Sequence, residues 1–389
     1  MSDIVLTSEQ EKAVTMVVDR INTSTPMTRL GGFAGTGKSL CIKKIIERLN
    51  KSMAVCAYTG KAASVLRQKG VQDAKTIHST IYKPREEVVR GPDGRDRLVV
   101  RWGLIGRDEL AAEGFIIDEA SMVGKEILDD LMSFGLPIIA VGDPGQLPPI
   151  SKNDVNLMDR PDFTMTEIHR QAADSEIIRL ATRIRTEYNF LYTLTEYEGA
   201  GLVIAPKCNV RNTADADVFV CGFNRTRAAL NDGARRRKNY VDLLVPGEQI
   251  IALANDRDLR VFNGLMGIVK EIGETIDTTI YPRGEDPKPV KKITAKVLWD
   301  GESEPRETNF SSYAFGGTAT DWNTNSAHMG HLVVADYGYA LTCHKSQGSQ
   351  WNKVVVLNEQ APKLWDQRRW AYTAVTRAAR ELVLGVDGL

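Results

Sequence analysis

The sequence predicts an α/β protein with two lobes, each built on a doubly wound parallel sheet. Three observations lead to this prediction. At 389 residues the chain is too long for one ordinary hydrophobic core. Short apolar runs that end in polar residues, typical of buried parallel strands, alternate with helical patterns. The alternation occurs in two stretches that less regular sequence separates, so we expect two similar lobes.

The first stretch predicts strands at 27–32, 53–59, 114–120 and 136–143, with helices at 39–49, 61–69 and 124–135. The second stretch predicts a strand at 216–223, a helix at 224–238 and strands at 333–341, 353–358 and 381–387. A strand-like segment at 293–300 lies between them, among residues rich in Gly, Pro, Thr and Asp. We therefore expect a first lobe at 1–160, a second lobe at 161–271 and 330–389, and a small β insertion at 272–329.

A phosphate-binding loop follows the first predicted strand. Residues 31–39 read GGFAGTGKS, and from Gly32 the pattern is G-x-x-x-x-G-K-S, the P-loop. The glycines let successive backbone N–H groups point into one concavity, and the following helix offers its positive N-terminal end to the same anion. A glycine-rich turn before an ordinary helix is the alternative, but the spacing and both flanks favour a nucleoside triphosphate site.

Composition excludes other classes of protein. The chain has no apolar run of about eighteen residues, so no membrane span is expected. Its polar N-terminus does not resemble a signal peptide. Five cysteines lack metal or disulfide spacing, which indicates reduced thiols and a cytoplasmic protein. A formal net charge of zero argues against binding nucleic acid through the overall field, although a local basic groove stays open.

Two acidic residues and a glutamine follow the next predicted strands. Asp118 and Glu119 stand at the carboxyl end of an apolar strand, where ligands bind in open α/β sheets. With a P-loop in the same lobe, we expect Asp118 and the Ser39 hydroxyl to hold Mg²⁺ and Glu119 to polarise the attacking water. Gln146, in VGDPGQLPP, is suited to sensing a γ-phosphate. An acidic surface turn and a plain Pro-Gly turn are the alternatives.

These motifs together resemble superfamily 1 DNA helicases of the RecD and bacteriophage Dda type (superfamily 1B). The resemblance rests on GFAGTGKS, AYTGKAA, KTIHS, IIDEAS and GDPGQLPP in the first lobe, and on TSEQEKAV before them. MTEIHRQ, VFVCGFNRTR, FNGLMG, ALTCHKSQGSQ and YTAVTRA follow in the family's order, from about Thr7 to Arg380. It implies two RecA-like lobes, a β-hairpin insertion in the first and a small SH3-like β insertion in the second.

The resemblance also implies the residues of the site. ATP would lie between the lobes with Lys38, Asp118, Glu119, Gln146, Arg170 and Arg377 as the catalytic groups, the two arginines neutralising the γ-phosphoryl oxygens. Nucleotide contacts are expected from Gln10, Gly32, Gly35, Thr36, Gly37, Lys38, Ser39, His169 and Gly348, and metal contacts from Ser39 and Asp118. Single-stranded DNA would contact Thr59, Lys61, Thr76, His78, Thr342, His344 and Lys345. Each of these would otherwise be an ordinary surface residue. Gln350 replaces an acidic residue that many relatives carry, which puts a ribose contact there in doubt.

A hairpin insertion is expected at about residues 80–107. Strand-like EEVVR and RLVVRW flank GPDG, which has the chemistry of a hairpin turn. Relatives carry a pin here that splits the duplex, and a surface hairpin without function is the alternative.

We therefore expect a monomeric, cytoplasmic, ATP- and Mg²⁺-dependent DNA helicase of a bacterium or phage. It would move 5′ to 3′ on single-stranded DNA and act at duplex junctions, with single-strand-binding or replication proteins as possible partners and no membrane. Three alternatives stay open: a DNA-stimulated translocase or remodeller without robust unwinding, an RNA helicase, and a nucleotide-dependent binding module without catalysis. The presence of Glu119, Gln146 and the arginines counts against the last.

Overall fold

The computed structural model describes residues 5–90, 96–149, 155–169, 174–207, 213, 215–254, 261, 264–280, 287–317, 332–359, 361 and 364–386. The chain divides into two units. The first comprises Met1–Tyr58, Ala62–Pro144 and Pro148–His169, and the second Thr59–Lys61, Gly145–Leu147 and Arg170–Leu389. No helix among the described residues is long and apolar enough to cross a membrane.

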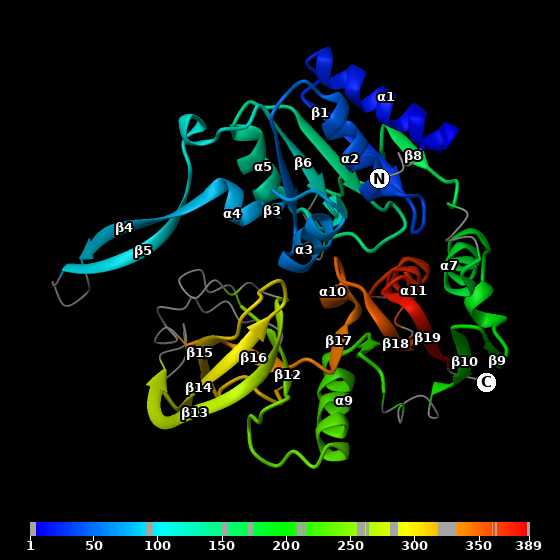
Figure 1. Cartoon of the computed structure of the whole chain (residues 1–389). Helices are drawn as coiled ribbons and strands as arrows, with labels where there is room; N and C mark the ends of the chain where they lie inside the picture. The colour runs from blue at the N-terminus through cyan, green and yellow to red at the C-terminus, as the bar shows by residue number, and fades with distance from the viewer. Residues whose placement is uncertain are drawn as a thin grey trace. The chain divides into compact units, whose positions relative to one another are not determined.

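The first unit is built on six parallel strands (Figure 1). In spatial order they are β3 (Lys75–Thr76), β2 (Met53–Ala57), β6 (Gly114–Asp118), β7 (Ile138–Gly142), β1 (Met27–Gly32) and β8 (Phe163–Met165). The central strands β6 and β7 are short and wholly buried because helices cover both faces of the sheet. The doubly wound architecture expected for this lobe is confirmed.

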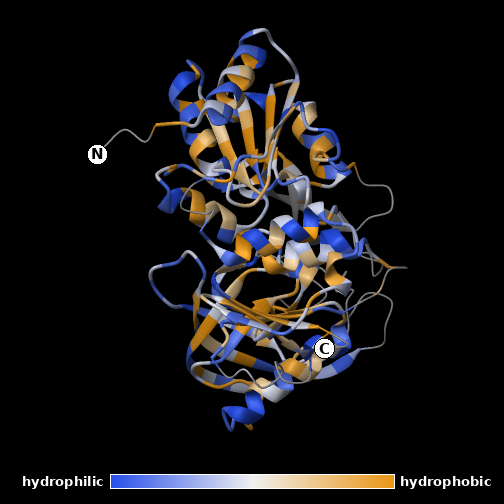
Figure 2. Cartoon of the chain, turned by 90° about the vertical axis from the view of Figure 1, so that its right-hand side faces the viewer, coloured by the Kyte–Doolittle hydropathy of each residue, from blue (hydrophilic) through white to orange (hydrophobic). Residues whose placement is uncertain are grey.

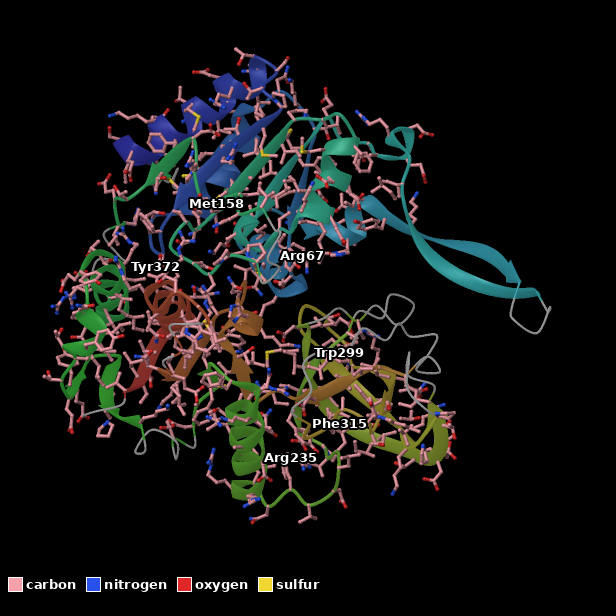
Figure 3. The ribbon with its side chains drawn as sticks, turned by 180° about the vertical axis from the view of Figure 1, so that it is seen from behind. Arg67, Met158, Arg235, Trp299, Phe315 and Tyr372 are labelled. Carbon is pink, nitrogen blue, oxygen red and sulfur yellow. The ribbon has the colours of Figure 1, made fainter. Side chains whose placement is uncertain are left out.

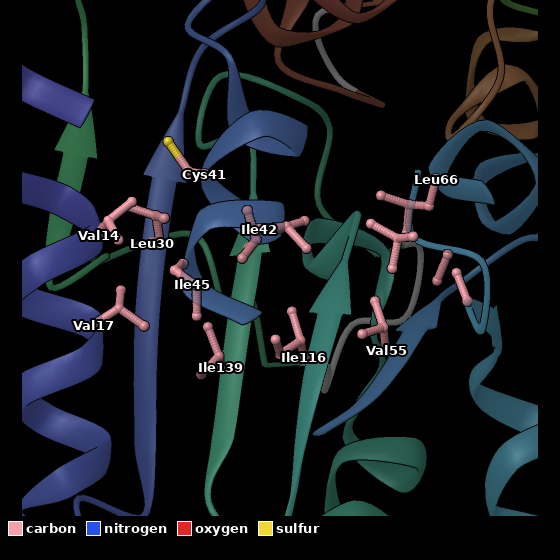
Figure 4. Packing of buried hydrophobic residues seen from close by; sticks show 14 of the residues in the cluster. Val14, Val17, Leu30, Cys41, Ile42, Ile45, Val55, Leu66, Ile116 and Ile139 are labelled. Carbon is pink, nitrogen blue, oxygen red and sulfur yellow. The ribbon is translucent and has the colours of Figure 1, made fainter. Parts of the chain in front are cut away.

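Helices α1 (Ser8–Asn22), α2 (Lys38–Arg48) and α3 (Gly60–Gln68) contribute to one core cluster of this unit. Figure 4 shows Val14 and Val17 of α1 and Ile42 and Ile45 of α2 packed against Leu30, Ile116 and Ile139 of the strands. A second cluster contains residues of α4 (Ile77–Ile81), α5 (Lys125–Ser133) and the short helix η2 (Ala120–Met122). Because the P-loop joins β1 to α2, this packing fixes both ends of the loop.

A long antiparallel hairpin extends from the first unit. Strands β4 (Tyr82–Arg90) and β5 (Asp96–Leu104) pair in unbroken register from Tyr82↔Leu104 to Arg90↔Asp96. At its base the Tyr82 hydroxyl donates to the Asp130 carboxylate, and Lys83 Nζ lies 2.6 Å from Glu109 Oε2, in the short helix η1 (Arg107–Glu109). The expected hairpin is therefore present, while the GPDG turn lies outside the described residues.

The second unit contains another six-stranded sheet. Its order is β17 (Ala340–Thr342), β11 (Val218–Cys221), β18 (Trp351–Leu357), β19 (Ala378–Val386), β10 (Leu202–Pro206) and β9 (Tyr197–Gly199), all parallel except β9. Helix α9 (Asn224–Arg237) packs on β11 and β17, while α7 (Glu176–Thr186) and α11 (Gln367–Val375) pack on β19. The short helices η3 (Phe190–Tyr192) and α10 (Cys343–Ser346) complete this part. Figure 2 shows the hydrophobic strands of both large sheets between helices with polar outer surfaces.

An antiparallel five-stranded sheet forms the small insertion. Its order is β15 (Arg306–Ser311), β14 (Lys288–Trp299), β13 (Met266–Ile280), β12 (Gln249–Ala252) and β16 (Ala335–Tyr337). Trp299 and Phe310 are buried in its core, and Phe315 packs against this core. Figure 3 labels Trp299 and Phe315 in this sheet. Helix α9 is tied to this sheet by the buried Arg227–Asp336 ion pair, whose N–O distance is 2.7 Å.

Three expected boundaries need correction. The first lobe does not end at residue 160, because β8 pairs with β1 and the unit continues to His169. The β insertion begins at Gln249 rather than at 272, because β12 pairs with β13. The single strand expected at 333–341 is two strands, since β16 joins the small sheet and β17 joins the large one. The SH3-like character of the insertion stays a prediction.

Candidate nucleotide and nucleic-acid site

The P-loop has the conformation that its glycines allow. Gly35 and Gly37 both have φ of 84°, in the left-handed region that favours glycine. A Cβ added to Gly37 would lie 2.4 Å from Gln10 Nε2, so this position also needs glycine for lack of space. The Thr36 hydroxyl donates to the Phe33 carbonyl at 2.8 Å and closes the loop on itself. Contacts within the protein therefore hold the loop in this conformation.

Lys38 lies across this loop. Its Nζ donates to the carbonyl oxygens of Gly32 at 2.8 Å and Phe33 at 3.3 Å, and lies 3.9 Å from the fully buried Asp143 carboxylate. Asp143 follows β7, the strand next to β1, which brings its charge to the same sheet edge. The ammonium is thus held at the loop without being part of a hydrophobic core.

Helix α1 braces the P-loop from outside. Gln10 is buried, its Oε1 accepts from the Thr7 backbone N–H at 3.0 Å, and its Nε2 donates to the Thr36 carbonyl at 3.0 Å. The His169 backbone N–H donates to the Gly35 carbonyl at 3.0 Å, so His169 also lies beside the loop. The expected contacts of Gln10 and His169 with adenine stay predictions, whereas their contacts with the loop are structural findings.

Asp118 and Glu119 lie at the carboxyl end of β6. Asp118 is buried, and burial together with the Glu119 charge raises its pKa to about 6, with Lys38, the Glu119 N–H and Lys69 opposing. Glu119 has φ of 53° and ψ of 40°, a left-handed conformation that is strained for a residue with a side chain. Within the described residues its Oε2 is buried without a hydrogen-bond partner. A buried carboxylate oxygen without a hydrogen-bond partner is typical of functional sites.

The residues present fit a magnesium ion. Ser39 Oγ accepts from Lys69 Nζ at 3.2 Å, and the Lys69 charge also acts on Asp118. A lysine ammonium therefore supplies positive charge to a hydroxyl and to a buried carboxylate, and hydroxyl and carboxylate oxygens are hard ligands of the kind that Mg²⁺ prefers. The unpartnered Glu119 oxygen adds to the negative charge that a cation would offset.

The other predicted catalytic residues belong to the second unit or are not described. Gln146 is buried with its Oε1 unpartnered among the described residues. Arg377 is buried and donates to the carbonyl oxygens of Thr373 at 2.9 Å and Ser349 at 3.1 Å, so its guanidinium holds the loop after α10. Arg170 lies outside the described residues. Contact of these three side chains with a nucleotide stays a prediction.

The predicted nucleic-acid contacts fall into two sets. In the first unit Thr76 ends β3 and its hydroxyl accepts from the Ser79 N–H to cap α4, the helix that contains His78. In the second unit Thr342 ends β17, and His344 and Lys345 follow in α10. Thr59 and Lys61 cluster with this unit. Burial lowers the pKa of Lys345 to about 8, with Arg227 acting in the same direction and Asp336 opposing. Gly348, in the loop that follows, has φ of 69°.

Lys61 is more enclosed than a surface phosphate contact. Its Nζ lies 4.1 Å from the Trp351 ring centroid and 3.8 Å from the Asp300 carboxylate. Burial lowers the Lys61 pKa, and Asp300 opposes this shift. These residues line a groove of about 520 Å³ with Gln350 and Asn352.

Two buried side chains that the sequence analysis missed hold the segment after Gln146. The Leu147 N–H donates to Thr373 Oγ1 at 2.9 Å, and Gln347 Nε2 donates to the Leu147 carbonyl at 2.8 Å. Gln347 stands in ALTCHKSQGSQ and Thr373 in YTAVTRA, but the sequence assigned site roles only to neighbouring residues of these motifs. Asp143 was missed in the same way, although it stands in the quoted GDPG segment.

Comparisons with known proteins agree with this geometry. Residues 5–205 match the family model described as AAA domain, and residues 337–384 match the UvrD-like helicase C-terminal domain. The chain is 26% identical over 376 residues to the ATP-dependent RecD2 DNA helicase of Deinococcus radiodurans, covering 90% of this chain and 45% of that protein. It is 24% identical to the ATP-dependent DNA helicase Pif1 of Bdellovibrio bacteriovorus, covering 90% and 81%.

Among solved structures, Bacteroides Pif1 bound to single-stranded DNA aligns with a TM-score of 0.55 and 19% identity. The alignment covers 99% of this chain and 93% of that one, which shows a shared fold. The chain spans less than half the length of the RecD2 relative.

Proposed function

The chain belongs to the AAA-domain family, and from that premise we propose that it is an ATP-dependent DNA helicase. It would translocate on single-stranded DNA and unwind duplexes. The proposal is supported by RecD-, Dda- and Pif1-type helicases among the relatives and by a second family match to a helicase C-terminal domain.

The observation that carries the proposal is the carboxyl edge of the first sheet. There the P-loop and Lys38 lie beside Asp143, and Asp118 and Glu119 end the neighbouring strand β6. A P-loop binds phosphates, and a strained glutamate with an unpartnered oxygen is suited to accept a proton from water. The first unit thus contains a phosphate-binding loop, a lysine charge beside it and a carboxylate that can act as a base.

Each residue then has a chemical task. The P-loop N–H groups and Lys38 bind and orient the phosphates, with Lys38 leaving the Gly32 and Phe33 carbonyls to do so. Ser39 and Asp118 would hold Mg²⁺, which neutralises phosphate charge when bound. Glu119 removes the proton from the attacking water. Gln146, Arg170 and Arg377 would sense or neutralise the γ-phosphate, as the motif resemblance implies.

The finer parts of the proposal rest on resemblance. These are the 5′-to-3′ direction, the junction substrate, the monomeric state and the cytoplasmic location. A partnership with single-strand-binding or replication proteins belongs with them.

Strand displacement tests the proposal directly. Duplexes with a 5′ or a 3′ single-stranded tail, in DNA and in RNA, are incubated with ATP and Mg²⁺, and the released strand is measured. We expect release from the 5′-tailed DNA. DNA-stimulated ATPase without release would identify a translocase, preference for RNA an RNA helicase, and absence of ATPase a binding module.

The matched controls are two lysines of helix α2. Lys38→Ala should abolish both ATPase and strand release while the protein keeps its melting temperature, because Lys38 contacts a loop and not a core. Lys44→Ala removes an exposed pairing with Glu47 and should leave both activities unchanged. Normal turnover in Lys38→Ala would contradict the P-loop assignment.

A further inference from the structure

Three aromatic residues follow three neighbouring strands of the second sheet. Strands β17, β11 and β18 are adjacent and parallel, so their carboxyl ends meet at one edge. His344 comes after β17, Phe223 after β11 and Trp365 after β18. None of the three lies close in sequence to the others, so the topology of the sheet brings them together.

Trp365 is the central ring of this set. Its ring centroid lies 5.3 Å from that of Phe223 and 6.5 Å from that of His344. It also stacks at 6.0 Å and 19° on Trp370, which is fully buried. In contrast to Trp370, the residues Trp365, Phe223 and His344 are each only partly buried. The set therefore has one member in the core and three members with some exposed surface.

Hydrogen bonds hold the Trp365 ring and the backbone segment that carries Phe223. Trp365 Nε1 donates to Gln367 Oε1 at 3.2 Å, and a Cβ on Gly222 would lie 2.9 Å from the Trp365 ring. The Glu359 carboxylate accepts from the backbone N–H groups of Gly222 and Phe223 at 2.7 and 3.1 Å. The Trp365 ring is thus held by the protein itself, which reduces the entropy lost on binding.

The charges around the rings favour an anionic ligand. Lys345 follows His344 directly, and the exposed Arg225 has its guanidinium 5.7 Å from the Phe223 ring centroid. The two nearby carboxylates already accept hydrogen bonds from backbone N–H groups, Glu359 as above and Asp366 from Arg368 and Arg369 at the start of α11. Cations beside fixed aromatic faces are the combination that binds single-stranded nucleic acid.

We propose that Trp365, supported by Phe223 and His344, is a stacking platform for a base of single-stranded DNA at the carboxyl edge of the second sheet. The proposal rests on the proposed function and adds to it a contact with the base itself. The residues expected from the motifs supply hydroxyls, imidazoles and lysines for phosphates. A base stacked on Trp365 would make binding depend on the presence of bases as well as on the backbone charge.

The test compares two ligands of the same length and charge. Fluorescence anisotropy measures the affinity of the full-length protein for oligo(dT) and for an oligonucleotide with abasic sites throughout. Trp365→Leu retains an apolar side chain against Gly222 and Trp370 but has no aromatic face. We expect it to bind oligo(dT) about 5- to 100-fold more weakly than the parent and to bind the abasic strand equally well. Trp365→Phe should recover most of the oligo(dT) affinity.

Tyr188→Ala is the matched control, since Tyr188 is an aromatic residue of the same unit that is 83% exposed. It should change neither affinity. Equal weakening on both ligands in Trp365→Leu, or no weakening on oligo(dT), would overturn the platform. If Trp365→Leu lost its thermal transition, the parent and Trp365→Phe would still test the platform. A parent that does not prefer oligo(dT) to the abasic strand has no stacked base, and this result would overturn the proposal. A parent that bound neither strand would contradict the proposed function itself.

Discussion

At the scale of single residues, Glu119 combines backbone strain with an unsatisfied charge. A left-handed conformation and a buried, unpartnered carboxylate oxygen each cost free energy. Both occur at the residue directly after Asp118, the predicted metal ligand. Sequence reasoning identified Glu119 from its place after an apolar strand. It could not predict the strain, because the φ angle of one residue depends on how the turn into η2 packs.

Glu119→Gln should retain ATP binding and slow hydrolysis. The amide has nearly the same shape as the carboxylate, but it cannot accept the proton of the attacking water, so the rate should fall about 10²- to 10⁴-fold. Single-turnover hydrolysis and the binding of a fluorescent ATP analogue measure the two effects. Hydrolysis at the parent rate would assign the base to another residue.

Lys345 should make DNA binding sensitive to pH. Because burial lowers its pKa to about 8, the ammonium present at pH 7 is largely lost by pH 9. Loss of one charge-assisted phosphate contact should weaken binding about tenfold over this range. Anisotropy titrations from pH 7 to 9 measure this effect. Lys345→Arg should flatten the profile, since a guanidinium stays charged, and a steep profile in that variant would assign the titration elsewhere.

At the scale of elements, the strands beside the motifs were predictable and the pairings of short strands were not. The apolar composition of β6 and β7 predicts buried strands. β8 has only three residues, and its place beside β1 follows from pairing across more than 130 residues of sequence. The same limit explains why β12 and β16 were not assigned to the small sheet, since tertiary pairing defines them rather than their own sequence pattern.

In the proposed function, the hairpin is the element that would distinguish a helicase from a translocase. Replacing Arg90–Arg97 by a short Gly-Ser turn leaves the contacts of Tyr82 and Lys83 at the base of the hairpin intact. The replaced residues are far in sequence from the P-loop. We expect nearly normal DNA-stimulated ATPase and displacement of an end-bound protein, but sharply reduced strand separation. The reason is that each base-pair step costs about 1–2 kcal/mol to open and needs a rigid obstacle.

Strand-displacement and ATPase assays on the same preparation measure both effects. Duplex unwinding at the parent rate would rule out the wedge. Loss of ATPase together with unwinding would make the hairpin a structural part of the first unit.

At the scale of the whole molecule, charge balance limits how the protein can hold DNA. Fifty basic residues match fifty acidic ones, so no long-range field attracts a polyanion. Of the two predicted lysine contacts, Lys61 is already engaged by Asp300 and Trp351. Composition alone predicted this balance, but the enclosure of Lys61 depends on residues that are distant in sequence and could not be predicted.

Binding of single-stranded DNA should therefore depend only weakly on salt. Each phosphate contact contributes a slope of about −0.7 in log affinity against log salt concentration, and two or three contacts give about −1.4 to −2.1. Anisotropy titrations between 50 and 200 mM salt, at about neutral pH, measure this slope. A slope steeper than about −5 would indicate a broad basic surface and contradict the prediction.

Because β4 and β5 pair without a break, the hairpin can be shortened without changing its faces only by an even number of residues per strand. Side chains alternate between the two faces of a strand, so removing one residue from each strand would turn every side chain beyond the cut to the opposite face. Removing two from each strand keeps the faces and draws the tip back by about 7 Å. The reach of the hairpin can therefore change in increments of two residues per strand, while its anchored base and the carboxyl edge of the first sheet keep their structure.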